Sequence, residues 1–134
     1  MAALRLASRN LLAKRTFVST SCRKVHYINA TKATFDQVAS NGSDDRLVLV
    51  DFYADWCGPC HALSPILKSV TDGSDNLDLV TIDVENESGG GSELAQQFQV
   101  SALPTVVAFR GGKQVDKFVG ALRKNQVQEF LDKL

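Results

Sequence analysis

The segment Asp51-Phe52-Tyr53-Ala54-Asp55-Trp56-Cys57-Gly58-Pro59-Cys60 decides how this chain of 134 residues is interpreted. It follows on the run Leu47-Val48-Leu49-Val50, and a short continuous apolar run predicts a strand buried on both faces, here Arg46–Tyr53. After it, the sequence predicts a helix from Cys57 to Val70 that contains Pro65 and is kinked there. Two cysteines therefore lie at the junction of a buried strand and a helix.

A cysteine at the start of a helix is favoured as a thiolate. Free backbone N–H groups and the helix dipole stabilise an anion at this position, so Cys57 is predicted to be the nucleophile. Cys60, one turn further along, is expected to lie deeper and to resolve a mixed disulfide with a substrate. Pro59 restricts the backbone between the two sulfurs, and Gly58 lets a partner chain approach closely.

Two cysteines at this spacing are also found in half of a zinc site. A structural zinc ion usually has four ligands, whereas the chain offers only Cys22, His26 and His61 besides this pair. We therefore expect no metal site and interpret the pair as a redox motif. The sequence has no dinucleotide-binding fingerprint and no phosphate-binding loop, so no cofactor is expected.

The rest of the chain alternates predicted strands and helices. Strands are predicted at Val25–Asn29, Leu77–Asp83, Thr105–Arg110 and Gln114–Val119, and helices at Thr34–Ser40, Glu93–Phe98 and Leu122–Leu134. Thr34 and Gln37 have capping-box spacing, and the glycine-rich Asn86–Ser92 predicts a flexible loop. The pattern predicts an α/β fold with a mixed central sheet of about five strands and about four helices on both faces.

The first 24 residues differ from the rest in charge. They hold six of the 15 basic residues and no acidic residue, so residues 25–134 have a net charge of about −6. Apolar residues recur near helical spacing between these basic residues, which is typical of a mitochondrial presequence drawn into the matrix by an inside-negative potential. A chloroplast transit peptide and a basic tail that stays attached are the alternatives.

The N-terminal segment also contains a candidate processing site, and the charge and apolar patterns bear on the class of partner. Arg15–Thr20 resembles a two-step processing site, which would remove Cys22 and leave Val25 as the new N-terminus. The acidic remainder gives no support for nucleic-acid binding. No run approaches the roughly 18 apolar residues of a membrane span, so no membrane association is expected.

Three segments together resemble the thioredoxin family. Asp51–Cys60 resembles its active-site segment, Ala102-Leu103-Pro104-Thr105 the segment with its cis-proline, and Phe118-Val119-Gly120-Ala121 its glycine turn. The resemblance covers about residues 28–134. It implies that residues 25–134 form a thioredoxin domain, behind a mitochondrial presequence at 1–24, and that this domain reduces disulfides in other proteins.

The resemblance also implies roles for the residues around the cysteines. Asp51 matches a buried acid that relays the proton of Cys60, and burial would raise its pKa toward neutrality. The alternative is a strand-end aspartate in a turn network. Pro104 matches the cis-proline, which would leave the Leu103 backbone free to pair with an extended client segment. Trp56 and Gly120 would form an apolar surface for clients around Cys57.

Four features depart from the family pattern. Tyr53 stands where many members have a second tryptophan, and His61 where lysine or arginine is common. Leu79 occupies the place of a lysine that accompanies the buried acid in some members. Ser88–Ser92 lengthens a surface loop; the alternatives are an altered choice of partners and no effect, and no effect is expected because such loops tolerate insertions.

Partners follow from the resemblance and from the absence of a cofactor motif. Electrons are expected from a thioredoxin reductase, a separate NADPH-dependent flavoprotein, and clients are disulfide-containing proteins such as peroxiredoxins. A monomer is expected. Gly58-Pro59 matches the reducing branch of the family, whereas isomerases usually have Gly-His between the cysteines. The rival hypothesis is a binding or structural subunit whose dithiol is secondary.

Overall fold

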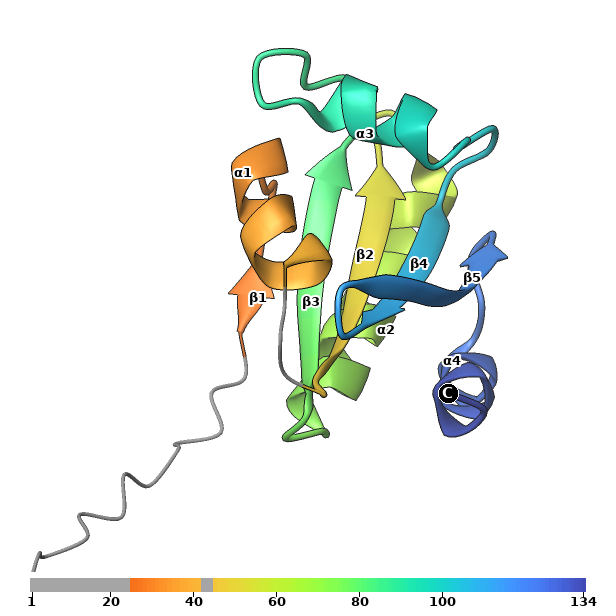
Figure 1. The fold of residues 1–134 in the computed structure, drawn as a ribbon. Coiled ribbons are helices and arrows are strands. Elements are labelled where there is room, and N and C mark those ends of the chain that lie inside the picture. Colours follow the sequence, from red (N-terminus) through yellow and green to blue (C-terminus); the bar gives the residue numbers. More distant parts are fainter. Residues whose placement is uncertain (1–24, 42–44) are drawn as a thin grey trace, which may run out of the picture.

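The computed structural model describes residues 25–41 and 45–134, and these form one sheet flanked by helices (Figure 1). In chain order the elements are β1 (His26–Tyr27), α1 (Lys32–Phe35) continuing into the π-helical turn η1 (Asp36–Ser40), β2 (Leu47–Tyr53), α2 (Gly58–Asp72), β3 (Leu77–Asp83), α3 (Gly91–Gln97), β4 (Thr105–Arg110), β5 (Lys113–Val119) and α4 (Lys124–Asp132). The predicted presequence and its processing site lie outside the described residues.

The sheet is mixed and has the strand order β1-β3-β2-β4-β5. β1 and β2 pair in parallel with β3, whereas β4 pairs antiparallel with both β2 and β5. β2 is central, and six of its seven residues are buried. The five-stranded mixed sheet is confirmed, and β3 and β4 have the bounds that the sequence predicts.

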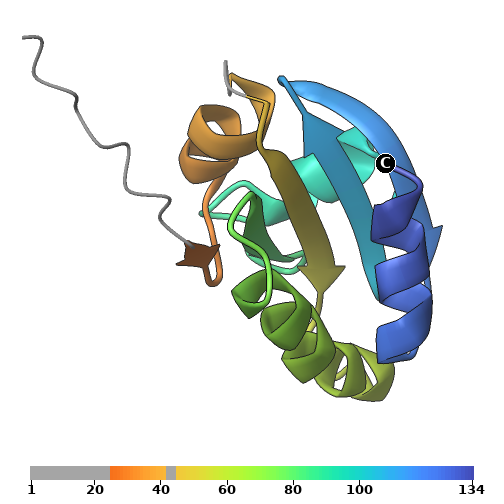
Figure 2. The same cartoon turned by 90° about the horizontal axis from the view of Figure 1, so that it is seen from below.

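Helices cover both faces of the sheet, as Figure 2 shows. On one face, Phe35 of α1, Ala39 of η1 and Leu94 of α3 pack against alternate strand residues such as Phe52. On the other face, Leu63 of α2 and Val127 of α4 pack against the intervening strand residues. The predicted apolar face of the last helix is confirmed, because Phe130, Leu131 and Leu134 pack there too. None of the helices in the described part of the chain is long and apolar enough to cross a membrane.

The first helix begins earlier than the sequence predicts. Its N-cap is Thr31, whose Oγ1 accepts a hydrogen bond from the backbone N–H of Thr34 at 3.4 Å. The capping-box prediction at Thr34 and Gln37 is therefore wrong. A cap needs a side-chain oxygen close to a free N–H, and Thr31 supplies one three residues upstream. The N–H of Lys32 also donates to the Gly89 carbonyl at 2.7 Å, which fixes this helix start against the loop between β3 and α3.

The glycine-rich loop ends sooner than predicted, because α3 already begins at Gly91. Gly91 is buried, and a Cβ atom there would clash with the carbonyl oxygen of Asp83 at the end of β3. Gly90 is the N-cap and has φ +80°, a conformation that L side chains rarely adopt. These glycines therefore let α3 start directly against β3.

Candidate active site

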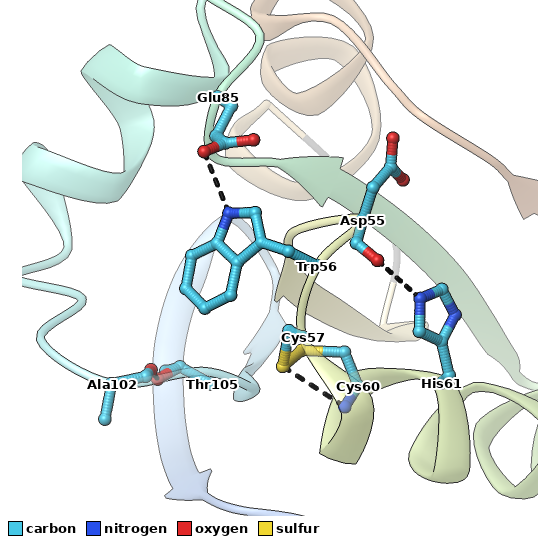
Figure 3. Close-up of a disulfide and its surroundings, with 8 residues drawn as sticks. All are labelled: Asp55, Trp56, Cys57, Cys60, His61, Glu85, Ala102 and Thr105. Atoms are coloured by element: carbon cyan, nitrogen blue, oxygen red, sulfur yellow. Dashed lines mark hydrogen bonds between the residues drawn. A yellow bond between two sulfur atoms is a disulfide. The ribbon is translucent and has the colours of Figure 1, made fainter.

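The two cysteines lie at the junction of β2 and α2, as predicted. Cys57 is the N-cap of α2, and its Sγ accepts a hydrogen bond from the backbone N–H of Cys60 at 3.3 Å. The two residues form a disulfide with a Cα–Cα distance of 5.3 Å (Figure 3). Pro59 stands in the first turn of the helix, where no backbone N–H is needed for an intrahelical bond. This position favours a thiolate at Cys57.

Both cysteines are nearly inaccessible in this oxidised state. Cys57 is 4% exposed and Cys60 is 3% exposed, so the expected difference in depth between them is hardly present. Ala54 is buried with them, and Val84 and Leu103 pack against this group. A Cβ atom at Gly58 would meet no other atom within 4 Å, so the space above the helix start is open to another chain.

Asp51 is buried within the sheet, in the interior of β2. It pairs in register with Thr81 of β3 and Val106 of β4, so the alternative of a strand-end residue in a turn network is wrong. Its Oδ1 has no hydrogen-bond partner among the residues that the structure describes. Burial raises the pKa of the Asp51 carboxyl group to about 7, which confirms the shift toward neutrality.

A cavity of about 160 Å³ lies beside this carboxyl group. It is lined by Asp51, Cys60, His61, Ser64, Lys68 and Thr81, among others, and is called the Asp51 cavity below. Leu79 is buried in the core with Leu63, so this position supplies no charge to the acid. The His61 ring donates from Nε2 to the backbone carbonyl of Asp55 at 2.7 Å, because a carbonyl oxygen accepts only (Figure 3).

A second hollow lies next to Trp56 and is called the Trp56 groove below. It has a volume of about 400 Å³ and is lined by Trp56, Val84, residues of α3 and the segment 99–103. The Trp56 side chain is 70% exposed. Its Nε1–H donates to Glu85 Oε1 at 2.8 Å (Figure 3). An apolar ring is thus held beside Cys57 at the protein surface.

The predicted cis-proline segment borders the same groove. The Leu103–Pro104 peptide bond is cis. The hydroxyl of Thr105 donates to the Ala102 carbonyl at 2.6 Å and closes the turn before β4. Gly120, with φ +95°, donates its N–H to the Pro104 carbonyl at 2.8 Å. The structure therefore brings the proline segment and the glycine turn together, with Leu103 against the cysteines.

Sequence reasoning missed Glu85, as well as Ser64, Lys68 and Thr81 of the Asp51 cavity. Glu85 follows β3 closely, just as Trp56 follows the neighbouring parallel strand β2, so strand pairing was the signal that could have joined them. Across residues 25–41 and 45–134, no three His, Cys, Asp or Glu side chains form a group that could hold a metal ion.

Comparisons with known proteins agree on one family. The thioredoxin family model matches residues 26–133, which span every element from β1 to α4. The mitochondrial thioredoxin of Mus musculus is 36% identical over 126 residues, 89% of this chain and 74% of that protein. The chloroplastic thioredoxin Y2 of Arabidopsis thaliana is 43% identical over 100 residues, 74% of this chain and 56% of that protein. The solved structure of Fasciola hepatica thioredoxin has a TM-score of 0.70 and 31% identity, over 80% of this chain and 97% of that one.

Proposed function

The chain belongs to the thioredoxin family and is a thiol–disulfide oxidoreductase, and from this premise we propose that it reduces disulfides in client proteins. One observation carries the proposal: the Cys57–Cys60 pair caps α2, with the Cys57 sulfur accepting a helix N–H. A sulfur in that position is stabilised as the attacking thiolate. Gly58 and Pro59 lie between the two sulfurs and are proposed to keep the reduction potential of the pair low, so that the dithiol reduces its clients.

The reaction proceeds through a mixed disulfide. The Cys57 thiolate attacks one client sulfur, and the other client sulfur leaves as a thiolate. Cys60 then loses its proton and attacks the Cys57 sulfur, which breaks the mixed disulfide and releases the second client thiol. Two electrons pass to the client, and the Cys57–Cys60 disulfide closes. A reductase must return those electrons before the next turnover.

Asp51 is proposed to take the proton of Cys60 in the second step. Both residues line the Asp51 cavity, and the pKa of the carboxyl group is raised to about 7, so it exchanges protons near neutral pH. The Asp51 cavity and the Trp56 groove share no lining residue, so a client in the groove is proposed to leave the cavity open. The cavity then supplies the route by which Asp51 passes the proton to solvent.

Clients are proposed to bind at the Trp56 groove as extended segments. The exposed Trp56 ring supplies apolar contact area, and the Leu103 backbone pairs with the client strand beside Pro104. Gly120 lies against Pro104 through its hydrogen bond and leaves the surface without a side chain there. Because this strand pairing recognises the client backbone, it tolerates many client sequences.

Localisation and partners are proposed from the N-terminus and from the relatives. Residues 1–24 are basic and free of acidic residues, and the Mus musculus relative is named mitochondrial, which supports a cleaved presequence and a matrix location. The chloroplastic relative from Arabidopsis thaliana is the opposing case. Import of the full chain into isolated mitochondria, with shortening to start at Val25, supports the proposal. Import only into chloroplasts contradicts it.

The proposed partners are a thioredoxin reductase, which uses NADPH through its own flavin, and disulfide clients such as peroxiredoxins. This chemistry needs no cofactor on the chain itself. The protein is proposed to act as a monomer. Reduction of the full chain by a thioredoxin reductase with NADPH, followed by client reduction, tests the electron path directly.

The reduction potential of the Cys57–Cys60 couple tests the direction of the reaction. Equilibration of the full chain with a glutathione series is expected to give roughly −250 mV or lower. A potential between about −180 and −120 mV would mean that the protein oxidises or isomerises clients. The rival binding role is tested by a Cys57→Ser, Cys60→Ser double variant, which is expected not to rescue a deletion phenotype. Rescue would favour the binding role.

A further inference from the structure

Glu85 owes its place beside Trp56 to the parallel pairing of β2 and β3. The last residues of the two strands, Tyr53 and Asp83, lie in register, so the segments that follow them leave the sheet at the same edge. Trp56 and Glu85 follow within three residues of these strand ends. Their side chains meet in the hydrogen bond from Nε1 to Oε1 at 2.8 Å (Figure 3).

The backbone that carries Glu85 is fixed on both sides. The carboxylate of Asp83 accepts the N–H of Glu85 at 2.9 Å, and the carbonyl of Tyr53 accepts the N–H of Val84 at 2.9 Å. The Glu85 carbonyl in turn accepts the N–H of Glu87 at 3.0 Å. A carboxylate on a fixed turn gives the exposed Trp56 indole one preferred orientation, because the indole N–H is a donor only.

Glu85 also sets the charge at the rim of the Trp56 groove. Every side chain that lines the groove is uncharged, whereas the segment Asp83-Val84-Glu85-Asn86-Glu87 beside it carries three acidic residues. Of these three, Glu85 has a carboxylate that accepts a hydrogen bond from a groove side chain, that of Trp56. A basic side chain on a bound segment would therefore meet a fixed carboxylate there, and an acidic one would be repelled.

We propose that Glu85 positions Trp56 and makes the Trp56 groove selective for client segments with a basic side chain next to the reacting cysteine. This inference rests on the proposed function, because it requires clients to occupy the groove. Glu85 acts as a positioning residue through the indole and as a specificity-determining residue through its charge. The two roles can be separated, because glutamine keeps a hydrogen-bond acceptor but loses the charge.

The experiment uses the full chain, reduced with dithiothreitol, in single-turnover reactions that need no reductase. The substrates are symmetric disulfides of three neutral peptides that differ only in the residue after cysteine, which is Lys, Gln or Glu. Glu85→Gln and Glu85→Ala are compared with wild type. Glu87→Gln is the matched control, because it removes the same charge from the same turn and Glu87 is exposed. Trp56 is the sole tryptophan, so fluorescence anisotropy reports the mobility of its indole.

Wild type and Glu87→Gln are expected to reduce the Lys peptide about fivefold faster than the Glu peptide, as suits an exposed charge pair. In Glu85→Gln and Glu85→Ala this ratio falls to within twofold of one. Glu85→Ala also lowers the anisotropy and the rate on the Gln peptide, and Glu85→Gln restores most of both. An unchanged ratio in Glu85→Gln, or an equal loss in Glu87→Gln, would overturn the inference. Failure of wild type to reduce the Gln peptide would count against the proposed function itself.

Discussion

Two regions near the Cys57–Cys60 disulfide differ in exposure: the Asp51 carboxyl group, buried beside a cavity that Cys60 also lines, and the exposed Trp56 indole, next to Cys57 in the chain; they are called the buried side and the exposed side below. Asp51 is 2% exposed and faces a cavity of about 160 Å³ that Cys60 also lines. Trp56 is 70% exposed and borders a groove of about 400 Å³. Burial shifts a pKa, whereas exposure leaves a surface for partners. Because the two hollows share no lining residue, we propose that proton transfer and client recognition use different residues of one small redox centre, so variants should separate them.

The largest effect is expected at the nucleophile, Cys57. Cys57→Ser should lower client reduction by at least about a thousandfold, because a hydroxyl group at this position is not ionised and cannot form the mixed disulfide. Cys60→Ser should instead accumulate the mixed disulfide with a client, which mass spectrometry of the intact complex detects. Accumulation of that complex by Cys57→Ser and not by Cys60→Ser would reverse the assigned roles.

The next effect is on the free energy of unfolding, and it comes from the buried carboxyl group of Asp51. The pKa of Asp51 rises from 3.8 to about 7 on folding, so the folded state holds a proton between these values that the unfolded state has lost. The free energy of unfolding therefore falls as pH rises from about 4 to 7, by up to about 4 kcal/mol. Asp51→Asn should remove this loss and be more stable than wild type at pH 8, with little difference near pH 4.

Denaturant unfolding of the oxidised full chain at several pH values measures this stability effect. Glu129→Gln is the control, because it removes an exposed carboxyl group from α4. Its stability relative to wild type should not change by more than a few tenths of a kcal/mol over the same range. A stability difference for Asp51→Asn that stayed constant from pH 4 to 8 would contradict the raised pKa.

A smaller effect is expected on the second chemical step. At neutral pH, Asp51→Asn should slow the attack of Cys60 on the mixed disulfide by about a hundredfold, because the general base is lost. The wild-type rate of this step should rise with pH through about 7, and the variant should lack that rise. Rapid acid quenching of the mixed disulfide gives the rate. Identical pH profiles for the two proteins would remove Asp51 from the mechanism.

The same contrast explains what the sequence could and could not predict about the fold. Apolar runs and strand–helix alternation are local, so β2, β3 and β4 were located to within a residue. The starts of α1 and α3 were wrong, because each is set by a distant contact. The N–H of Lys32 binds the Gly89 carbonyl, and Gly91 packs against the end of β3. A local pattern does not contain such contacts.

Prediction of the site divides in a similar way. The strand–turn–helix junction places Cys57 at a helix start, so its role as the nucleophilic thiolate can be predicted from the residues alone. The raised pKa of Asp51 required the family resemblance, because an isolated aspartate inside an apolar run does not show how deeply it is buried. Glu85 was missed because its contact with Trp56 depends on the register of two parallel strands. Strand register depends on tertiary contacts, and it cannot be inferred from a single sequence.

The smallest effect is expected on the exposed side, at Trp56. Trp56→Ala should reduce kcat/KM for a protein client by about tenfold, because aromatic anchors carry much of the binding energy in interfaces. The loss should be much smaller for a small-molecule disulfide, which cannot fill the Trp56 groove, and Trp56→Phe should recover part of it by restoring a ring. The pH profile of the second step should match wild type, because Trp56 does not line the Asp51 cavity. A tenfold loss on both substrates together with a shifted pH profile would mean that the indole acts on the sulfurs themselves. The buried side and the exposed side would then be coupled, and the separation of proton transfer from recognition would be wrong.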